Sequence, residues 1–312
     1  MDRIDAMKVF VAAIDEGSLA GAARKLGKSP AAVSRAIAFL EHQIGAELIH
    51  RTTRSLKLSE AGDRYIVACR RVLTDLEEAD ILAAGERSAP RGLLTLTSTV
   101  MTGEEILRPV VDAFLEEYPA VCTRLHLLDR WVNLIDEGID LALRIGDLAD
   151  SALIAIRIGE VRRVVVAAPR YLEANPAIRE PGDLAQHRII AYAGLGTESW
   201  AFPAAAGASV PRTVTFTPRL TVNTIRAATA SAIDGFGVTR LLSYHIAEPL
   251  RAGKLKILLA QDEGPPQPVH LLAPQGRLQV PKVRAFVEFA VPRLKALFAR
   301  LSIEADSAAI RS

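Results

Sequence analysis

The sequence predicts an α+β protein built from several domains: a helical N-terminal head, one long helix, and a C-terminal body in which strands alternate with helices. Three observations predict this division. Up to about residue 58 the chain has the pattern of short helices joined by tight turns, and residues 59–88 form one continuous helical run. Pro90 and Gly92 then break the helix, and the period-two alternation of a strand begins at Leu93.

Size and composition limit the class of protein. The chain has 312 residues, 50% hydrophobic and 24% charged, which is enough for two or three cored domains. Its 38 basic and 36 acidic residues give a net charge of +2, so any affinity for nucleic acid must come from local clustering. The two cysteines, Cys69 and Cys122, are too few for a disulfide framework and are expected to be small apolar side chains. We find no secretory signal and no apolar stretch of membrane-spanning length, and therefore expect a cytoplasmic protein.

The head begins with three predicted helices, the first over residues 3–15. Ser18 caps the second, Gly27 supplies a left-handed turn position, and Ser29 followed by Pro30 starts the third. The buried residues are expected to be Met7, Phe10, Val11 and Ile14 in the first, Leu19, Ala22, Ala23 and Leu26 in the second, and Val33, Ile37, Leu40 and Ile44 in the third.

The third helix turns small residues and one arginine outward. These outward residues are Ala31, Ser34, Arg35, Ala38 and His42. Small side chains allow close approach to a DNA major groove, where Arg35 can reach a phosphate or a guanine edge. Ala23, Gly27 and Val33 have the spacing of a helix-turn-helix, and an ordinary three-helix subdomain is the alternative.

Residues 48–58 are predicted to form a two-stranded wing. From Lys28 to Lys57 there are five basic residues against two acidic ones, Glu41 and Glu47. The basic residues are Lys28, Arg35, Arg51, Arg54 and Lys57. This excess predicts nucleic-acid binding, in which wing arginines contact phosphates or enter the minor groove; a solvated basic surface is the alternative.

The helix after the wing is predicted to mediate dimerisation. Its apolar residues recur at an average spacing near 3.5 and are Ala61, Tyr65, Ala68, Val72, Leu76, Ala79 and Ala83. At about 1.5 Å per residue the helix is roughly 40 Å long, which exceeds what one small domain can cover. Pairing with a second copy would present two recognition helices to a two-fold symmetric site, and a helix lying on its own chain is the alternative.

The body, residues 89–303, shows the rhythm of βαβ units and predicts parallel sheets flanked by helices. The chain is expected to cross to a second lobe at residues 163–169 and to return at residues 268–274. Lobe I then comprises about 91–163 and 268–303, lobe II about 164–267, and residues 304–312 form a tail. Two crossings give a hinged, periplasmic-binding-protein-like plan that closes on a ligand.

Candidate ligand-binding residues of lobe I follow strands. The hydroxyl groups of Ser98, Thr99 and Thr102 come after the first strand, where ligands of α/β sheets bind. Helix capping is the alternative for these hydroxyls, and Thr102 with Glu105 has the spacing of a capping box.

Arg144 ends a later strand of lobe I, where it would pair with a ligand carboxylate or, alternatively, with Asp129 or Asp147. The candidates of lobe II lie in predicted loops and turns and are Thr197, Trp200, Asn223, Phe236 and Gly237. Trp200 is a candidate for ligand stacking, and its alternative is a packing aromatic.

No enzymatic motif is found, whether a phosphate-binding loop, a dinucleotide fingerprint, a zinc-protease motif or a nucleophile elbow. The six histidines are scattered without the spacing of metal ligands, and Ser243 and His245 are too close in sequence to face each other as a hydrolytic pair. We therefore predict no catalytic residue, no metal site and no cofactor.

The first ninety residues resemble a LysR-type transcriptional regulator. The segments that carry the resemblance are SLAGAA at 18–23, SPAAVSR at 29–35, Leu40-Glu41 with Gly45 following, and RTTRSLKLSEAG at 51–62. The remaining chain is similar to the effector domain of that family in length and β/α rhythm. One departure is the recognition helix, which carries Ala31, Ala32, Ala36 and Ala38 where the family often has basic or amide residues. This departure favours contacts with thymine methyl groups and recognition of DNA shape.

The resemblance implies a bacterial winged helix-turn-helix regulator that acts as a homo-oligomer, a dimer or tetramer. Its implied partners are promoter DNA with an interrupted palindrome, a small-molecule effector for which a carboxylic acid is a candidate, and RNA polymerase. The competing hypothesis is a solute-binding or enzymatic α/β protein with an incidental helical head. The expected DNA-binding residues are Lys28, Ser29, Pro30, Ala31, Ser34, Arg35, Ala38, Arg51, Thr52, Arg54 and Lys57.

Overall fold

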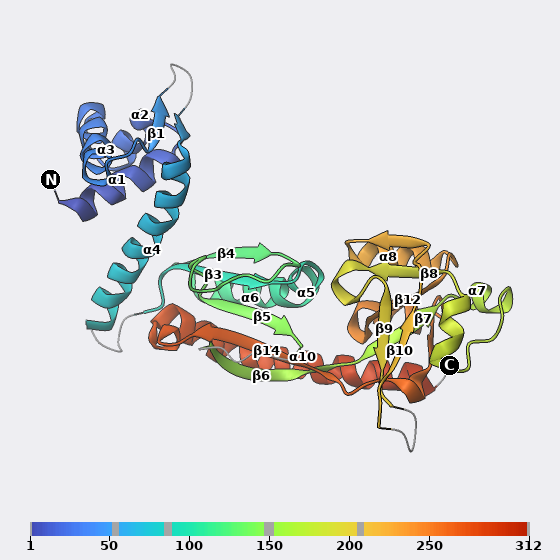
Figure 1. Ribbon diagram of the computed structural model, residues 1–312. Helices are drawn as coiled ribbons and strands as arrows, with labels where there is room; N and C mark the ends of the chain where they lie inside the picture. The colour runs from blue at the N-terminus through green and yellow to red at the C-terminus, as the bar shows by residue number, and fades with distance from the viewer. Residues whose placement is uncertain (1, 52–55, 84–88, 147–152, 205–208, 311–312) are drawn as a thin grey trace. The chain divides into compact units, whose positions relative to one another are not determined.

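The computed structural model describes residues 2–51, 56–83, 89–146, 153–204 and 209–310. The chain divides into two compact units, Met1–Ala89 and Pro90–Ser312, which we call the winged unit and the regulatory unit and describe separately (Figure 1). The winged unit contains α1 (Arg3–Asp15), α2 (Leu19–Lys25), α3 (Pro30–Ile44), β1 (Ile49–Arg51), β2 (Leu56–Leu58) and α4 (Glu60–Ala83).

The helix starts of the winged unit confirm the capping predictions. The hydroxyl oxygen of Ser18 accepts a hydrogen bond from the backbone N–H of Gly21 at 3.0 Å, and that of Ser29 accepts one from Ala32 at 3.2 Å. Gly27 has a φ of +61°, the left-handed conformation expected in the turn between α2 and α3. Local sequence signals therefore position α3, with Pro30 in its first turn.

One apolar core holds the winged unit together. Its fully buried side chains include Phe10 of α1, Ala22 of α2, and Val33, Ile37 and Leu40 of α3. The other residues expected to face inward, Val11, Ile14, Leu19, Leu26 and Ile44, are partly buried against the same core. The buried stripe of α3 is thus the predicted one, and it fixes which face of this helix points outward.

Helix α4 has two kinds of apolar residue. Near its start, Ile66 and Cys69 are buried in the core of the winged unit, and Ala61 and Tyr65 pack against that core, with the Tyr65 ring 6.1 Å from the ring of Phe10. At this end Ala61 and Tyr65 are partly buried on their own chain, and their pairing with a second copy stays a prediction. The seam residues further along, Ala68, Val72, Leu76 and Ala79, are exposed.

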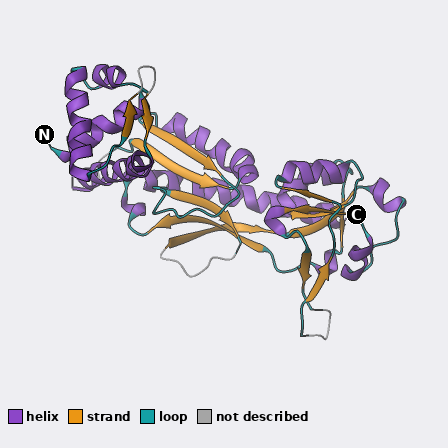
Figure 2. Cartoon of the chain, turned by 45° about the horizontal axis from the view of Figure 1, so that its top comes forward, coloured by secondary structure: helices purple, strands orange, loops and turns teal. Residues whose placement is uncertain are grey.

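The regulatory unit contains two five-stranded sheets with helices packed on their faces (Figure 2). The first sheet has the order β4-β3-β5-β14-β6 and is formed by β3 (Gly92–Ser98), β4 (Val121–Leu127), β5 (Leu141–Ile145), β6 (Leu153–Val161) and β14 (Gln267–Pro274). The second has the order β11-β8-β12-β7-β13 and is formed by β7 (Arg163–Ala167), β8 (Ile189–Tyr192), β11 (Leu220–Val222), β12 (Val238–Leu242) and β13 (Lys256–Leu258). A separate hairpin consists of β9 (Ser199–Phe202) and β10 (Arg212–Thr215).

The helices of the regulatory unit connect these strands. With the first sheet are α5 (Val100–Thr102), the π-helical turn η1 (Gly103–Leu107), α6 (Arg108–Glu117), the 3-10 turn η6 (Arg277–Gln279) and α10 (Pro281–Ile310). With the second are α7 (Pro169–Glu173), α8 (Ile225–Ile233), α9 (Ala247–Arg251) and the 3-10 turns η2 (Pro181–Gln186), η3 (Ala193–Leu195), η4 (Ser243–Ile246) and η5 (Ala260–Asp262). Helix α10 packs on β6 and also contacts η4 and α9, so one helix touches both lobes.

The sheets are mixed, whereas the alternation of strands and helices predicted parallel ones. β3 pairs in parallel with β4 and β5, whereas β14 is antiparallel to both β5 and β6. In the second sheet β8 is parallel to β11 and β12, whereas β7 is antiparallel to β12 and β13. The antiparallel strands β6, β7, β13 and β14 are those nearest the two crossings, where the chain passes from one sheet to the other.

Two further predictions are wrong in detail. Thr102 and Glu105 form no capping box, because the helix starts earlier, at Val100, and Thr102 already has helical φ and ψ. Residues 304–312 do not begin as a tail, since the backbone of α10 stays helical to Ile310. Among the helices of the described ranges, none is both long and apolar enough to cross a membrane.

Candidate functional site

The outward face of α3 and its N-terminal approach form the first candidate site. Ala31, Arg35, Ala38 and His42 are exposed, as are Lys28, Ser29 and Pro30, while Ser34 is half-buried. Ala36, one of the alanines noted on this helix, is 1% exposed, so it belongs to the core and offers no methyl group to DNA. The exposed surface is therefore narrow, with Arg35 as its long cationic side chain.

The predicted wing is an antiparallel pair in which His50 lies opposite Lys57. Lys57 is exposed, and the backbone of Arg51 pairs with that of Leu56. Thr52 and Arg54, also predicted to bind DNA, lie outside the described residues.

The carboxylate of Glu41 on α3 fixes the approach to the wing. It accepts hydrogen bonds from the backbone N–H groups of Leu48 at 2.9 Å and Ile49 at 3.3 Å. Glu41 is one of the two acidic residues between Lys28 and Lys57, and its carboxylate is thus occupied by backbone N–H donors.

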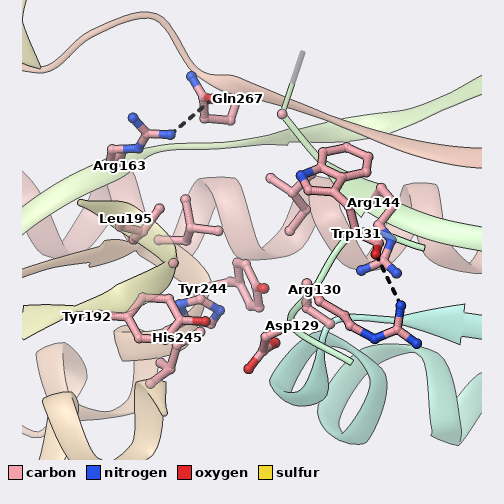
Figure 3. Close-up of a pocket in the computed structure, with 16 residues that line it drawn as sticks. Asp129, Arg130, Trp131, Arg144, Arg163, Tyr192, Leu195, Tyr244, His245 and Gln267 are labelled. Atoms are coloured by element: carbon pink, nitrogen blue, oxygen red, sulfur yellow. Dashed lines mark hydrogen bonds between the residues drawn. The ribbon is translucent and has the colours of Figure 1, made fainter. Parts of the chain in front are cut away.

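The second candidate site is a cavity of about 200 Å³ in the regulatory unit, between the two sheets (Figure 3). From the first lobe it is lined by Thr99, the segment 129–131 after β4, and the segment 144–146 at the end of β5. From the second lobe and the crossings it is lined by Arg163, Tyr192, Gly194, Leu195, Ile225, Leu242, Tyr244, His245 and Gln267. In each sheet, the carboxyl ends of parallel strands therefore face this cavity, which is where ligands of α/β sheets bind.

Arg144 is the buried cation of this cavity. Its guanidinium donates hydrogen bonds to the carbonyl oxygen of Leu128 at 3.2 Å and to the hydroxyl of Thr97 at 3.3 Å, which use two of its five N–H groups. Burial lowers its pKa, and the neighbouring carboxylate of Asp129 opposes this shift. Of the two predicted acidic partners, Asp129 thus acts through its charge, and Asp147 lies outside the described residues.

Two more arginines line the cavity. Arg163 donates to the side-chain oxygen of Gln267 at 3.4 Å, joining the two strands that cross between the lobes. Arg130 forms an ion pair with Glu137 at 3.0 Å and donates to the carbonyl oxygen of Trp131. Trp131 lines the cavity while being 71% exposed, so it lies at the rim. Three arginines and the carboxylate of Asp129 make the lining predominantly positive.

Asp129 joins the two lobes. Its carboxylate accepts a hydrogen bond from the backbone N–H of Val100 at 3.0 Å, at the start of α5. Tyr192, from the second lobe, lies near this carboxylate: burial, and after it the charge of Asp129, raise the pKa of Tyr192 to about 12. The chain's own carboxylate therefore occupies the helix start that an anionic ligand would otherwise approach.

A chain of hydroxyl groups forms a second link between the lobes. The Thr99 and Thr102 hydroxyls are 2.7 Å apart, and that of Thr102 lies 2.6 Å from the hydroxyl of Tyr244. Burial raises the pKa of Tyr244, so the phenol stays protonated and keeps a donor for this chain. The predicted residues Thr99 and Thr102 thus lie at or next to the cavity, where Thr99 forms part of the wall.

His245 forms part of the wall from the second lobe, within η4 after the end of β12. Its imidazole ring lies 4.1 Å from the ring of Tyr244, centroid to centroid. Burial lowers the pKa of His245 to about 3, so the ring is neutral at physiological pH.

Several predicted effector-binding residues lie elsewhere. Trp200 is in β9 and 1% exposed, packed against Phe216 at a ring distance of 4.8 Å, so the alternative of a packing aromatic holds. The ring of Phe236 packs against Arg188, and a Cβ atom at Gly237 would lie 2.2 Å from the carbonyl oxygen of Arg188. Both precede β12 and are therefore at the amino end of that strand, opposite the edge that faces the cavity.

The remaining predicted residues also lie outside the lining. Ser98 is fully buried, and its hydroxyl donates to the carbonyl oxygen of Leu143 at 3.3 Å. Thr197 and Asn223 are at or near the surface and line no part of the cavity. Of the effector-binding residues predicted from sequence, Thr99 and Arg144 line the cavity itself.

Sequence reasoning missed Asp129, Trp131, Tyr192, Tyr244 and His245 as cavity residues. One signal was available for most of them: Tyr192 ends β8, Tyr244 and His245 follow β12, and Asp129 follows β4, all at carboxyl ends of parallel strands.

Within the described ranges no group of three or more metal-ligating side chains is found.

The chain matches known families over most of its length. Residues 4–63 match the bacterial regulatory helix-turn-helix proteins of the lysR family, and residues 87–295 match the LysR substrate binding domain. An HTH-type transcriptional regulator of Xanthomonas campestris pv. campestris is 34% identical over 290 residues, covering 92% of this chain and 84% of that protein. An HTH-type transcriptional repressor of Pseudomonas aeruginosa is 31% identical over 292 residues, covering 93% and 92%.

Solved structures show the same architecture. CrgA, a LysR-type transcriptional regulator from Neisseria meningitidis, is 28% identical with a TM-score of 0.59, covering 93% of this chain and 98% of CrgA. The full-length virulence activator AphB of Vibrio cholerae is 26% identical with a TM-score of 0.60, covering 94% and 99%. These matches confirm the predicted fold class and the predicted resemblance. The chain belongs to the LysR family of bacterial transcriptional regulators.

Proposed function

We propose that this regulator binds promoter DNA as a homo-oligomer and that a small carboxylic acid, bound in the cavity of the regulatory unit, changes that binding. The observation that carries the proposal is the presence, in one chain, of an exposed basic surface on α3 and the wing and of a cavity whose wall holds Arg130, Arg144 and Arg163. The proposal assigns the cavity no catalytic step and no cofactor, and it places the protein in the cytoplasm, where its DNA target lies.

In this proposal residues 1–58 bind DNA and α4 pairs with α4 of a second copy. Val72 and Leu76 support the pairing, because these large apolar side chains are 40% and 38% exposed on one side of α4. A two-fold pair of winged units fits an interrupted palindrome, in which each recognition helix enters one major groove. Further copies, giving a tetramer, and RNA polymerase are the additional partners that the proposal includes.

The acidic effector is argued from the charges of the wall. Asp129 already accepts the N–H of Val100, so an incoming carboxylate is directed to the arginines instead. Guanidinium groups bind carboxylates through paired hydrogen bonds, and burial strengthens the attraction. Leu195, Ile225 and Leu242 provide apolar wall for the rest of such a molecule. A ligand held by both lobes changes the balance between their arrangements, which is how binding reaches the DNA-binding units.

Arg35→Ala is expected to weaken binding of the full-length protein to the promoter beside its own gene by roughly tenfold or more, since a base or phosphate contact contributes about 1–3 kcal/mol. Gel-shift titrations over a series of salt concentrations measure both the affinity and its salt dependence. If Arg35 contacts a phosphate, the salt slope falls by about one in the variant.

Arg64→Ala is the matched control, because it removes one positive charge from α4 at a residue paired with Glu60 and outside the proposed surface. We expect its affinity to stay close to wild type. A wild-type protein that gives no specific shift, or an Arg64 variant as defective as the Arg35 variant, would contradict the assignment of α3 as the recognition helix.

Arg144→Gln is expected to weaken binding of carboxylic acids at least tenfold, because it removes the buried cation while leaving a shorter, uncharged polar group. Isothermal titration of the full-length protein with benzoate and cyclohexanecarboxylate measures the change. Arg124→Gln, a charge loss at an exposed residue of β4, is the control and should bind as wild type does. Equal affinity of the Arg144 variant and wild type for both acids would remove Arg144 from the site.

A further inference from the structure

The imidazole ring of His245 is a buried polar group without a hydrogen bond. His245 is 5% exposed, and both ring nitrogens are shielded from solvent. Among the described residues neither nitrogen has a hydrogen-bond partner. Buried polar side chains nearly always have a hydrogen-bond partner. Two ring nitrogens without one, on a residue in the wall of a cavity, therefore point to a partner that enters the cavity.

The neighbouring hydroxyl groups of Tyr192 and Tyr244 do not serve this ring, because neither of its nitrogens has a hydrogen-bond partner. The hydroxyl of Tyr244 is engaged elsewhere, 2.6 Å from the hydroxyl of Thr102. The tyrosine beside His245 in the chain therefore joins the lobes, while the histidine itself borders the open volume.

The protonation state of His245 decides which ligand group suits it. Because burial keeps the ring neutral, one nitrogen donates a hydrogen bond and the other accepts one. A carboxylate can only accept and an ammonium group can only donate, and an ammonium group is also repelled by the arginines of the wall. A hydroxyl group does both, so it pairs with whichever nitrogen it reaches, in either tautomer.

We propose that His245 is a specificity-determining residue that hydrogen-bonds a hydroxyl group of the effector, and that the effector is therefore a hydroxylated carboxylic acid with an apolar body. This inference rests on the proposed function, which supplies the acid and its arginine partners. Arg144 belongs to the first lobe and His245 to the second, so such a molecule contacts both lobes, one through each polar end. A hydroxylated acid supplies the hydrogen bond that the imidazole lacks in the free protein, which favours its binding over that of the acid without the hydroxyl.

The experiment compares acids that differ by one hydroxyl group. Full-length wild type, His245→Phe and His245→Gln are titrated calorimetrically with benzoate and its three monohydroxy isomers, and with cyclohexanecarboxylate and its 4-hydroxy derivative. We expect wild type to bind the best hydroxylated member of a set at least tenfold tighter than the parent acid. In His245→Phe this ratio should fall to about one, and His245→Gln, which keeps a donor and an acceptor, should recover part of it.

The outcomes separate the two proposals. A hydroxyl preference that survives in His245→Phe, or a wild type that binds every parent acid as tightly as its hydroxylated forms, overturns the role of His245 while leaving the acid site in place. A preference that disappears in His245→Phe while Arg144→Gln binds all the acids normally supports His245 and contradicts the arginine site. Wild type that binds none of the six acids overturns both. Should His245→Phe fail to fold, the ratio measured in His245→Gln, compared with wild type, decides.

Discussion

Gly62→Ala is expected to unfold the winged unit and abolish DNA binding. Gly62 is buried in the first turn of α4, and a Cβ atom there would lie 2.0 Å from the backbone carbonyl oxygen of Leu48. That carbonyl cannot withdraw cheaply, because it accepts a hydrogen bond from Ser59 at 3.0 Å while the N–H of the same residue is bound to Glu41. We expect a loss of about 3 kcal/mol or more in the free energy of unfolding, as overpacking against fixed backbone produces.

Gly27→Ala provides the matched control. Gly27 has a φ of +61°, but nothing lies within 4 Å of a Cβ atom built there. Alanine at this position therefore causes no steric clash, and the left-handed backbone conformation alone lowers the free energy of unfolding, by about 1 kcal/mol. Urea unfolding followed by far-UV circular dichroism, together with a gel shift, measures both variants. Equal stability of the Gly62 and Gly27 variants would contradict the close approach of α4 to Leu48.

The pH dependence of stability is the second large effect. The pKa of His245 is about 3 in the folded protein, against about 6.5 for an exposed histidine. Between these values the unfolded chain binds a proton that the folded chain excludes, so lowering the pH favours unfolding. The contribution of His245 is complete above about pH 6.5 and is lost as the pH falls toward 3. From pH 7 to pH 4 it amounts to roughly 3 kcal/mol.

His245→Phe isolates this contribution from that of all other titrating groups. The variant keeps an aromatic ring beside Tyr244 but has no proton to bind, so its stability should fall less steeply with acid. Denaturant unfolding of both proteins at several pH values, without effector, gives the difference directly. Parallel stability curves for wild type and variant between pH 7 and pH 4 would show that His245 titrates normally.

The winged unit could be predicted well because its signals are local. Ser18, Gly27, Ser29 and Pro30 each act within a few residues of their own position, and the periodic apolar residues of α3 identified its buried face. Tyr65 shows the limit of such reasoning. It fits the periodicity of an intermolecular seam, yet its ring packs on α1, and only the path of the chain in space decides between the two.

The cavity was predicted poorly because its residues come from segments far apart in the sequence. Arg144, Tyr192 and His245 come to line one cavity only after two sheets have formed. The order of strands within a sheet cannot be predicted from the sequence of any single segment. Phe236 and Gly237 were assigned to the ligand because they sit in a tight turn, but the turn enters β12 at its amino end. Trp200 was assigned to a loop, whereas it lies in a hairpin strand whose partner, β10, is separated from β9 by nine residues.

The place of β14 in the first sheet bears on how the chain folds during synthesis. β14 lies between β5 and β6, and it is the strand that joins them. A growing chain that has released only residues up to β13 therefore has a first sheet in two separate pieces, with the backbone N–H and C=O groups of β5 and β6 that face β14 still unpaired. The winged unit has all its strand and helix partners within the first 83 residues and can fold as it leaves the ribosome. The DNA-binding part is thus complete long before the part that controls it.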